Sequence, residues 1–412
     1  VQTMSSLYAK NINSLNMTLD KCKLDVICKT QTNPFNWRGQ FTPDLVAYLL
    51  DTFAKEGSVV ADPFAGSGTV LLESAKRGYS CIGLDINPSA YYMSKFYEYS
   101  TLSTDKREGL MQIIRTLIGN AVMSIADTVP VYVDDKDYRK AYSNLLDFSI
   151  WVANNTPMNL WPFLINVLFL CEKDKKLPLK KSLIANLNKI RNYLFELPFT
   201  TSTISAKNED ARRISSYCNS SVDLILTSPP YVNVFNYHQN FRGIVECFQY
   251  NICEIASSEI GSNRKHRSNR YKTVVQYAED MGRVLCENTK ALKTGGKMIY
   301  IVGKESSVRK TPFYNSQIIS DLVDCISGLN VVDIHHRYFM NRFGETIQED
   351  LLEIEKETCS PDAEQLISCF ETVGFKHLEK AIPYSPEENK ADIYAILEKK
   401  DVVFESPILK AI

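Results

Sequence analysis

Hydrophobic and polar positions alternate along the chain as short apolar runs, each followed by a turn and a stretch with helical spacing. Residues 57–62 (GSVVAD) form such a run, and the apolar positions of residues 69–75 recur at helical spacing after a glycine-rich turn. A second run, residues 79–85 (YSCIGLD), also ends on an acid, and Asn87 and Pro88 are typical of the start of another helix. We therefore expect a βαβ unit here.

The same order of elements recurs in the second half of the chain. Residues 222–226 are predicted as a strand that ends before a Pro-Pro turn, and residues 297–302 as a strand that follows a Gly-Gly turn. Two late strands are predicted at residues 330–339 and 391–397. Alternating strands and helices predict an α/β fold that is Rossmann-like and doubly wound, with a mostly parallel sheet and right-handed crossovers.

Two segments interrupt this pattern. Residues 102–197 have helical apolar spacing and few glycines, and the segment is too long for a loop. We interpret it as an inserted helical subdomain. The acid-rich stretch 344–387 is predicted to be a second, smaller insertion.

Composition excludes several special classes of protein. The 412 residues are 44% hydrophobic and 23% charged, as in ordinary globular proteins and unlike disordered or collagen-like chains. The longest apolar run, residues 160–171, contains Pro and Asn and is shorter than the ~20 residues that a membrane span needs. No signal-peptide pattern begins the sequence, so we expect no membrane and a cytoplasmic location. The 11 cysteines form no C-x-x-C pair, which favours reduced thiols over a zinc ribbon.

Charge is balanced overall, with 47 basic against 48 acidic residues, but it is unevenly placed. Residues 261–272 (GSNRKHRSNRYK) carry five Lys and Arg side chains and no acid. Such a run suits either a contact with nucleic-acid phosphates or a solvated loop. The Lys-rich stretch 173–189 is more typical of a solvated helix face.

The glycine-rich turn is the first candidate binding site. Gly66 and Gly68 let the backbone approach a ligand closely at a helix N-terminus. The turn lacks the Lys of a P-loop and the third glycine of the dinucleotide fingerprint. Asp85, at the end of the next strand, stands where an acid accepts both ribose hydroxyls of an adenosine-containing ligand. The glycine turn and Asp85 together favour an adenosine ligand that has no pyrophosphate.

The second candidate site is the turn Ser228-Pro229-Pro230-Tyr231, which follows a predicted strand at the edge of the sheet where ligands bind. Two consecutive prolines fix the backbone. The Pro229 carbonyl and the Ser228 hydroxyl can then act as acceptors, while Tyr231 offers a flat face for stacking. This arrangement suits a planar ring with an exocyclic amine.

With these motifs the sequence resembles the S-adenosylmethionine-dependent DNA amino-methyltransferases, which methylate cytosine N4 or adenine N6. Residues 62–69 (DPFAGSGT) resemble the family's cofactor motif, and residues 227–231 (TSPPY) its catalytic motif. Residues 33–43 resemble the segment that precedes the cofactor motif, and residues 208–212 the loop after the third strand. The resemblance covers a little over half of the chain and implies a seven-stranded methyltransferase sheet.

The resemblance also implies roles for individual residues. Cofactor binding is expected for Phe35, Trp37, Asp62, Pro63, Phe64, Gly66, Gly68, Thr69, Asp85, Ile86, Asp210 and Ala211. Catalysis is expected for Ser228, Pro229, Pro230 and Tyr231, and DNA binding for Arg264, Lys265, Arg267 and Arg270. The resemblance implies S-adenosylmethionine as the cofactor, and direct attack on its sulfonium methyl would require no metal.

The expected substrate is double-stranded DNA with the target base flipped out, and a cognate restriction endonuclease is the partner that the family implies. Ser228 before the prolines favours cytosine N4, whereas the cofactor turn is more usual in enzymes of the reverse motif order and keeps adenine N6 as a second hypothesis. An RNA guanine-N2 methyltransferase and a non-catalytic methyltransferase-like scaffold are the third and fourth hypotheses. Cytosine C5 methylation needs a nucleophilic Cys after Pro, and the sequence has none.

These expectations divide the chain into six parts. They are an N-terminal extension (1–32), the cofactor-binding part of the catalytic domain (33–101), the helical insertion with a target-recognition role (102–199), the second part of the catalytic domain (200–343), the acidic insertion (344–387), and a last strand and tail (388–412).

Overall fold

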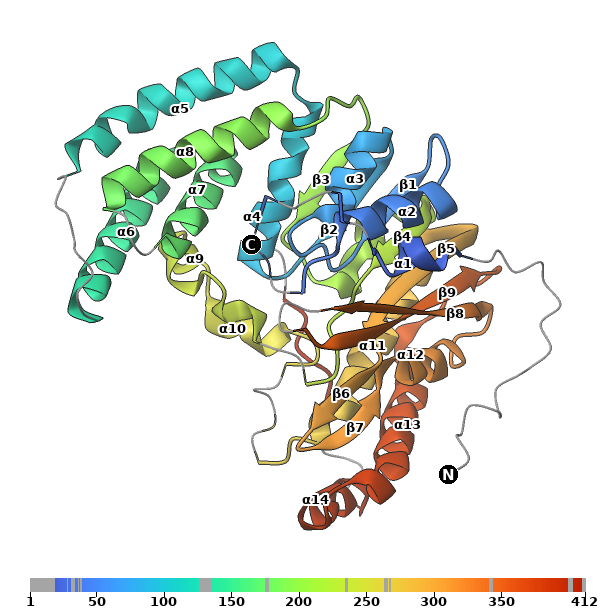
Figure 1. Cartoon of the computed structure of the whole chain (residues 1–412). Coiled ribbons are helices and arrows are strands. Elements are labelled where there is room, and N and C mark those ends of the chain that lie inside the picture. Colours follow the sequence, from blue (N-terminus) through green and yellow to red (C-terminus); the bar gives the residue numbers. More distant parts are fainter. Residues whose placement is uncertain are drawn as a thin grey trace.

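The computed structural model describes residues 19–27, 29–30, 34–35, 37, 39–125, 135–174, 178–233, 236–262, 266, 268–340, 344–398 and 403–409. A seven-stranded sheet with strand order β3-β2-β1-β4-β5-β9-β8 forms its centre (Figure 1). The strands are β1 (Val59–Asp62), β2 (Ser80–Leu84), β3 (Ile204–Lys207), β4 (Val222–Thr227), β5 (Leu292–Gly303), β8 (Leu329–Met340) and β9 (Thr346–Lys356). The first five pair in parallel, and β9 runs antiparallel to both of its neighbours. The predicted α/β fold with a mostly parallel sheet is confirmed.

Helices cover both faces of this sheet, and a small hairpin pairs β6 (Glu305–Val308) with β7 (Thr311–Tyr314). The α-helices are α1 (Lys21–Leu24), α2 (Pro43–Phe53), α3 (Thr69–Arg77), α4 (Pro88–Lys95), α5 (Thr104–Ser124), α6 (Asp135–Asn155), α7 (Trp161–Lys173), α8 (Leu179–Glu196), α9 (Arg242–Cys247), α10 (Ile252–Ser258), α11 (Lys272–Ala291), α12 (Asn315–Val323), α13 (Ala363–Ala381) and α14 (Glu387–Glu398). Short 3-10 helices are η2 (Phe96–Thr101), η3 (Met158–Leu160), η4 (Ala211–Ser216), η5 (Tyr237–Gln239) and η6 (Ile382–Tyr384).

The predicted βαβ unit is β1-α3-β2, and a glycine fixes its turn. Gly68 stands at the N-cap of α3 with φ of +83°, in the left-handed region that favours glycine. A Cβ at this position would lie 2.7 Å from the Cα of Ser94 and 2.7 Å from the ring of Tyr97. The turn therefore packs directly against α4 and η2, which a larger residue would prevent.

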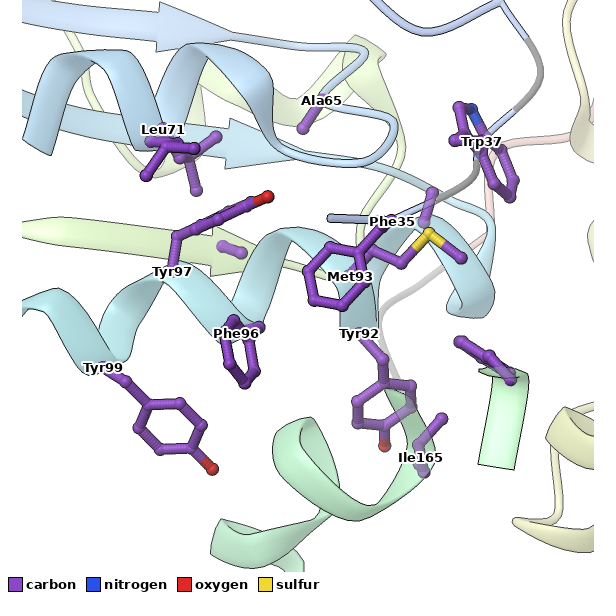
Figure 2. Packing of buried hydrophobic residues seen from close by; sticks show 14 of the residues in the cluster. Phe35, Trp37, Ala65, Leu71, Tyr92, Met93, Phe96, Tyr97, Tyr99 and Ile165 are labelled. Atoms are coloured by element: carbon purple, nitrogen blue, oxygen red, sulfur yellow. The ribbon is translucent and has the colours of Figure 1, made fainter. Parts of the chain in front are cut away.

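Two hydrophobic clusters fill the space between sheet and helices, and strand β4 contributes to both. Leu224 and Leu226 belong to one cluster and Val222 and Ile225 to the other, as expected for a central strand buried on both faces. Figure 2 shows part of the first cluster around Tyr97, where aromatic side chains pack below the glycine turn. This packing gives the strand ends a rigid base.

Helices α5 to α8 occupy the stretch predicted as a helical insertion, between β2 and β3 in the chain, and gather at one end of the molecule (Figure 1). Arg107 of α5 connects the end of α8 with η2: its buried guanidinium donates to the carbonyls of Leu197 (2.7 Å) and Pro198 (2.7 Å), and its Nε donates to the carbonyl of Tyr99 (3.3 Å). A target-recognition role for helices α5 to α8 stays a prediction.

The apolar run 160–171 lies mostly in α7, a buried helix of 13 residues. Among the described residues no helix is long and apolar enough to cross a membrane.

Three expectations for the C-terminal third are wrong. Residues 344–387 are not an insertion, because β9 lies inside the sheet between β5 and β8. Its acids do not prevent this: Glu353 pairs with Lys297 (2.5 Å), and neighbouring leucines face the core. Residues 391–397, predicted as the last strand, lie in helix α14. A disulfide joins Cys325 to Cys369, so the thiols are not all reduced.

Candidate active site

A pocket lies at the carboxyl ends of β1, β2 and β4 and encloses about 880 Å³ of space without protein atoms, its open side included. Most of the predicted site residues line it: Trp37, Pro63, Phe64, Gly66, Thr69, Asp85, Ile86, Asp210, Ala211, Ser228 and Pro230. The glycine turn and the Pro-Pro turn are far apart in sequence. They meet because β1 and β4 are adjacent parallel strands, with Ala61 opposite Ile225. Their functional roles stay predictions.

Two backbone N–H groups, one of them in the glycine turn, bind the carboxyl of Asp85. The backbone N–H of Gly66 donates to one carboxylate oxygen of Asp85 (2.9 Å), and the N–H of Asn87 donates to the other (2.9 Å). These contacts fix the orientation of the carboxyl while each oxygen keeps a lone pair for a ligand. Burial raises the pKa of Asp85 to about 7, and the negative charge of Glu259 adds to the increase.

Asp62 lies beneath the turn rather than in the pocket wall. Its carboxyl accepts from the Thr227 hydroxyl (2.6 Å) and from the N–H of Phe64 (3.1 Å), and 1% of the residue is exposed. Burial raises its pKa to about 7. The contact to Thr227 joins the end of β1 to the end of β4 and thereby holds the two turns together.

The Pro-Pro turn presents the Ser228 oxygen in a defined way. The Ser228 hydroxyl donates to the carbonyl of Ile301 (3.0 Å), so its remaining lone pairs can accept from a ligand amine. The carbonyl of Pro230 accepts from the Tyr277 hydroxyl (3.0 Å), which anchors the turn from below. Pro229 is not among the residues that line the pocket.

Tyr231, predicted to stack on the base, packs elsewhere. A Cβ at Gly303 would lie 2.9 Å from the Tyr231 ring, so this ring lies directly on the backbone of β5. Its hydroxyl donates weakly to Glu349 (3.5 Å), and burial raises its pKa well above the usual range. Tyr231 does not line the pocket in this arrangement.

The two aromatic residues predicted to close the site have different environments. Trp37 lines the pocket and stacks on Tyr237, with ring centroids 5.8 Å apart. Phe35 is buried in the core, where its ring centroid lies 5.3 Å from that of Phe96 (Figure 2). Trp37 lines the pocket and Phe35 does not, so Trp37 is the better candidate for ligand contact. Residues 33, 36 and 38 of the same segment lie outside the described residues.

Asp210 lines the pocket and is also held by a buried cation. Arg212 donates to Asp210 (2.6 Å) and to Asp280 (3.0 Å), and it also donates to the carbonyl of Pro407 near the C-terminal end (3.0 Å). Ser258 donates to the same Asp210 oxygen (3.3 Å). The network fixes Asp210 at the start of η4, next to Ala211.

Sequence reasoning missed the remaining part of the pocket wall. The residues concerned are Gly39, Gln40, Phe41, Ala65, Ser67, Asn87, Tyr237, Ser258, Glu259 and Ile260. Residues 258–260 lie at the end of α10 and belong to no motif, so only their position in the fold could reveal them. Sequence offered a signal for the others except Tyr237: Gly39, Gln40 and Phe41 lie in the segment 33–43, Ala65 and Ser67 lie in the motif 62–69, and Asn87 lies two positions after Asp85.

The predicted phosphate-binding residues are largely untested. Arg264, Lys265 and Arg267 lie outside the described residues. Arg270 is described; it is half-buried and its guanidinium donates to Asn233 (3.4 Å).

The charge of the pocket wall limits which ligands fit. Asp85, Asp210 and Glu259 contribute carboxyls, whereas the described lining residues include no Lys, Arg or His. Such a wall repels the phosphates of a nucleotide and suits a ligand with hydroxyls, an amine or a positive charge. S-adenosylmethionine has all three features and fits this donor set. Among the described residues, no group of three or more His, Cys, Asp or Glu is placed to bind a metal ion.

Comparison with known proteins finds similarity to DNA methyltransferases in the N-terminal part of the chain. A family model described as DNA methylase, of N6/N4 type, matches residues 16–96. The type II methyltransferase M.MjaII of Methanocaldococcus jannaschii is 42% identical over 52 residues, which are 13% of this chain and 10% of that protein. The aligned region therefore spans about a tenth of that relative's length.

Two solved structures align with this chain at low similarity. A SAM-dependent methyltransferase of Methanosarcina mazei is similar with a TM-score of 0.34 and 12% identity, over 76% of this chain and 98% of that one. An rRNA methyltransferase of Streptomyces viridochromogenes has a TM-score of 0.30 and 9% identity, over 84% of this chain and 94% of that one. At these scores neither likeness carries an argument about the chain. The family match covers residues 16–96, which include the glycine turn and Asp85, so this part of the chain is similar to the N6/N4 DNA methylases.

Proposed function

We propose that this protein transfers a methyl group from S-adenosylmethionine to the exocyclic amino nitrogen of a base in double-stranded DNA, with cytosine N4 as the target. The observation that supports the proposal most is the meeting of two turns in one pocket. Gly66 and Asp85 offer contacts for an adenosine ligand, and Ser228 offers an acceptor for an amine. One pocket can therefore hold a methyl donor and a methyl acceptor together.

The Pro-Pro turn would activate the acceptor. The lone pair of an amino group on an aromatic ring is delocalised into the ring, which makes the nitrogen a weak nucleophile. Ser228 Oγ would accept one amino hydrogen and draw the nitrogen towards tetrahedral geometry. The Pro229 carbonyl, the second acceptor that the motif implies, does not line the pocket in this arrangement. Because the Ser228 hydroxyl already donates to Ile301, it is oriented as an acceptor.

The bound cofactor would supply an electrophilic methyl group on a sulfonium sulfur. Transfer forms an N–C bond in line with the breaking C–S bond, the sulfur keeps the electron pair of that bond, and the amino nitrogen then releases one proton. The carboxyls of Asp85, Asp210 and Glu259 would orient the donor. A base within a duplex cannot enter a pocket at the ends of buried strands, so the base must be flipped out.

Other parts of the proposal follow from the resemblance to the DNA amino-methyltransferases. Cytosine N4 is favoured by Ser228, and adenine N6, which the same pocket would accept, is the second candidate. Helices α5 to α8 and the basic residues 264–270 are proposed to contact DNA. We further propose a cytoplasmic enzyme that acts beside a cognate restriction endonuclease.

Transfer of a labelled methyl group into unmodified DNA tests the proposal. Ser228→Ala should reduce the rate of transfer roughly 100- to 1,000-fold, the effect of removing one preorganised hydrogen bond to the transition state. Ser257→Ala on α10, an exposed hydroxyl outside the pocket, is the matched control and should keep the full rate. Equal rates for the wild type and Ser228→Ala would contradict the proposed role of the turn.

A further inference from the structure

A buried His–Glu pair supports one wall of the pocket. Glu259 lines the pocket, and one of its carboxylate oxygens lies 2.6 Å from Nδ1 of His238. The side chains are 7% and 3% exposed. His238 stands in η5, and Glu259 follows directly after α10, so two separate elements of the loop region fix this carboxyl.

The other carboxylate oxygen of Glu259 is buried and has no hydrogen-bond partner in the part of the chain that the structure describes. Leaving a buried carboxylate oxygen unpaired is unfavourable, so a polar ligand group is expected to complete it. The side-chain N–H₂ of Asn87 is also buried without a partner among the described residues, and Asn87 lines the same pocket. An unpaired acceptor and an unpaired donor thus belong to one wall.

Both groups share a pocket with Asp85. Asn87 donates its backbone N–H to Asp85 (2.9 Å), and Glu259 lines the same pocket. The negative charge of Glu259 also helps to raise the pKa of Asp85. A ligand group here faces two acceptors and one donor. A hydroxyl both donates and accepts, and a vicinal diol offers two of them.

We propose that Glu259 is a second ribose-binding carboxyl, which accepts a hydrogen bond from one ribose hydroxyl of the cofactor while Asp85 accepts from the other. This inference rests on the proposed function, because it takes an adenosine cofactor as the ligand. Asn87 donates to the same diol. His238 is a positioning residue: its ring donates to one oxygen of Glu259 and thereby leaves the other, unpaired oxygen for the diol.

A double-mutant cycle, with one change in the protein and one in the ligand, tests the contact between Glu259 and the ribose. Binding of S-adenosylhomocysteine and of its 2′-deoxy and 3′-deoxy analogues is measured by calorimetry for the wild type and for Glu259→Gln. In the wild type, loss of the hydroxyl that Glu259 binds should weaken affinity roughly 10- to 100-fold, as for a charge-assisted hydrogen bond. In Glu259→Gln the same deletion should cost several-fold less.

Two further variants keep the test decisive. His238→Gln should reduce the cost of that same hydroxyl deletion, whereas Glu254→Gln, an exposed acid on α10 outside the pocket, should match the wild type. Each comparison uses two ligands on one variant, so a fraction of misfolded protein changes the stoichiometry and leaves the affinity ratio intact. The inference is refuted if removing the 2′ hydroxyl weakens binding by the same factor in the wild type and in Glu259→Gln, and removing the 3′ hydroxyl does so too. That result would leave the proposed function standing. Failure of the wild type to bind S-adenosylhomocysteine would overturn both.

Discussion

Replacing Gly68 by Ala should destabilise the protein because the glycine turn has no room for a side chain. A non-glycine residue in the left-handed region costs about 1–2 kcal/mol. The added Cβ would also lie 2.7 Å from the Cα of Ser94 and 2.7–2.9 Å from the Tyr97 ring, and backbone atoms cannot rotate away. Overpacking of this kind adds about 1–3 kcal/mol. Gly68→Ala should therefore lower the free energy of unfolding by about 2–5 kcal/mol.

Gly57 provides a matched control. Its φ is +80°, close to that of Gly68, but a Cβ there would have no atom within 4 Å. Gly57→Ala should carry the conformational cost alone. In equilibrium urea unfolding, a difference of about 1–3 kcal/mol between the two variants places the Gly68→Ala midpoint roughly 0.3–1 M lower, at a slope of about 3 kcal/mol/M. Equal midpoints would refute the reasoning from close packing of the turn.

Three other predictions concern ionisation and the base. The affinity for S-adenosylhomocysteine should rise as the pH increases from about 6 to about 8, because the pKa of Asp85 is raised to about 7 and its ionised form is the better acceptor; Asp85→Asn should weaken binding and flatten this profile in calorimetry. The pKa of Asp62 is also raised to about 7, so the folded state holds a proton that the unfolded state loses above pH 3.8. Stability measured by urea unfolding should therefore decrease as the pH rises towards 7, and Asp62→Asn should show a smaller decrease; a steeper one would contradict the assignment. Tyr231→Ala should lower kcat for DNA methylation more than it lowers cofactor affinity, because the Tyr231 ring packs on the backbone of β5 directly after the Pro-Pro turn and does not line the pocket; a larger loss of cofactor affinity than of kcat would contradict this.

The strand ends could be predicted from sequence because each has a strong local signal. Asp62, Asp85 and Ser228 follow short apolar runs, and parallel strands bring such positions to one edge of a sheet. The sequence did not indicate which residues of the glycine motif line the pocket and which are buried beneath the turn. Asp62 and Gly68 belong to the glycine motif but support the turn from below, because a tight turn has an inner and an outer side that spacing does not distinguish.

The C-terminal strands and the far wall of the pocket could not be predicted in the same way. The acid-rich composition of β9 suggested an exposed insertion, yet basic residues on neighbouring strands pair with its acids. Residues 391–397 have an apolar content that suits either a strand or a helix, and packing against α13 decides for the helix. His238 and Glu259 are 21 positions apart, and only the fold brings them together.

Mass spectrometry of nucleosides tests the central claim most directly. Unmodified DNA, with tRNA in parallel, is incubated with the protein and S-adenosylmethionine that carries a deuterated methyl group, and is then digested. We predict deuterated N4-methylcytosine in DNA. Deuterated N6-methyladenine would keep the pocket and the reaction but change the base. Product in RNA alone, or no product from a protein that binds the cofactor and has been offered DNA of many sequences, would contradict the claim that this chain is a DNA amino-methyltransferase.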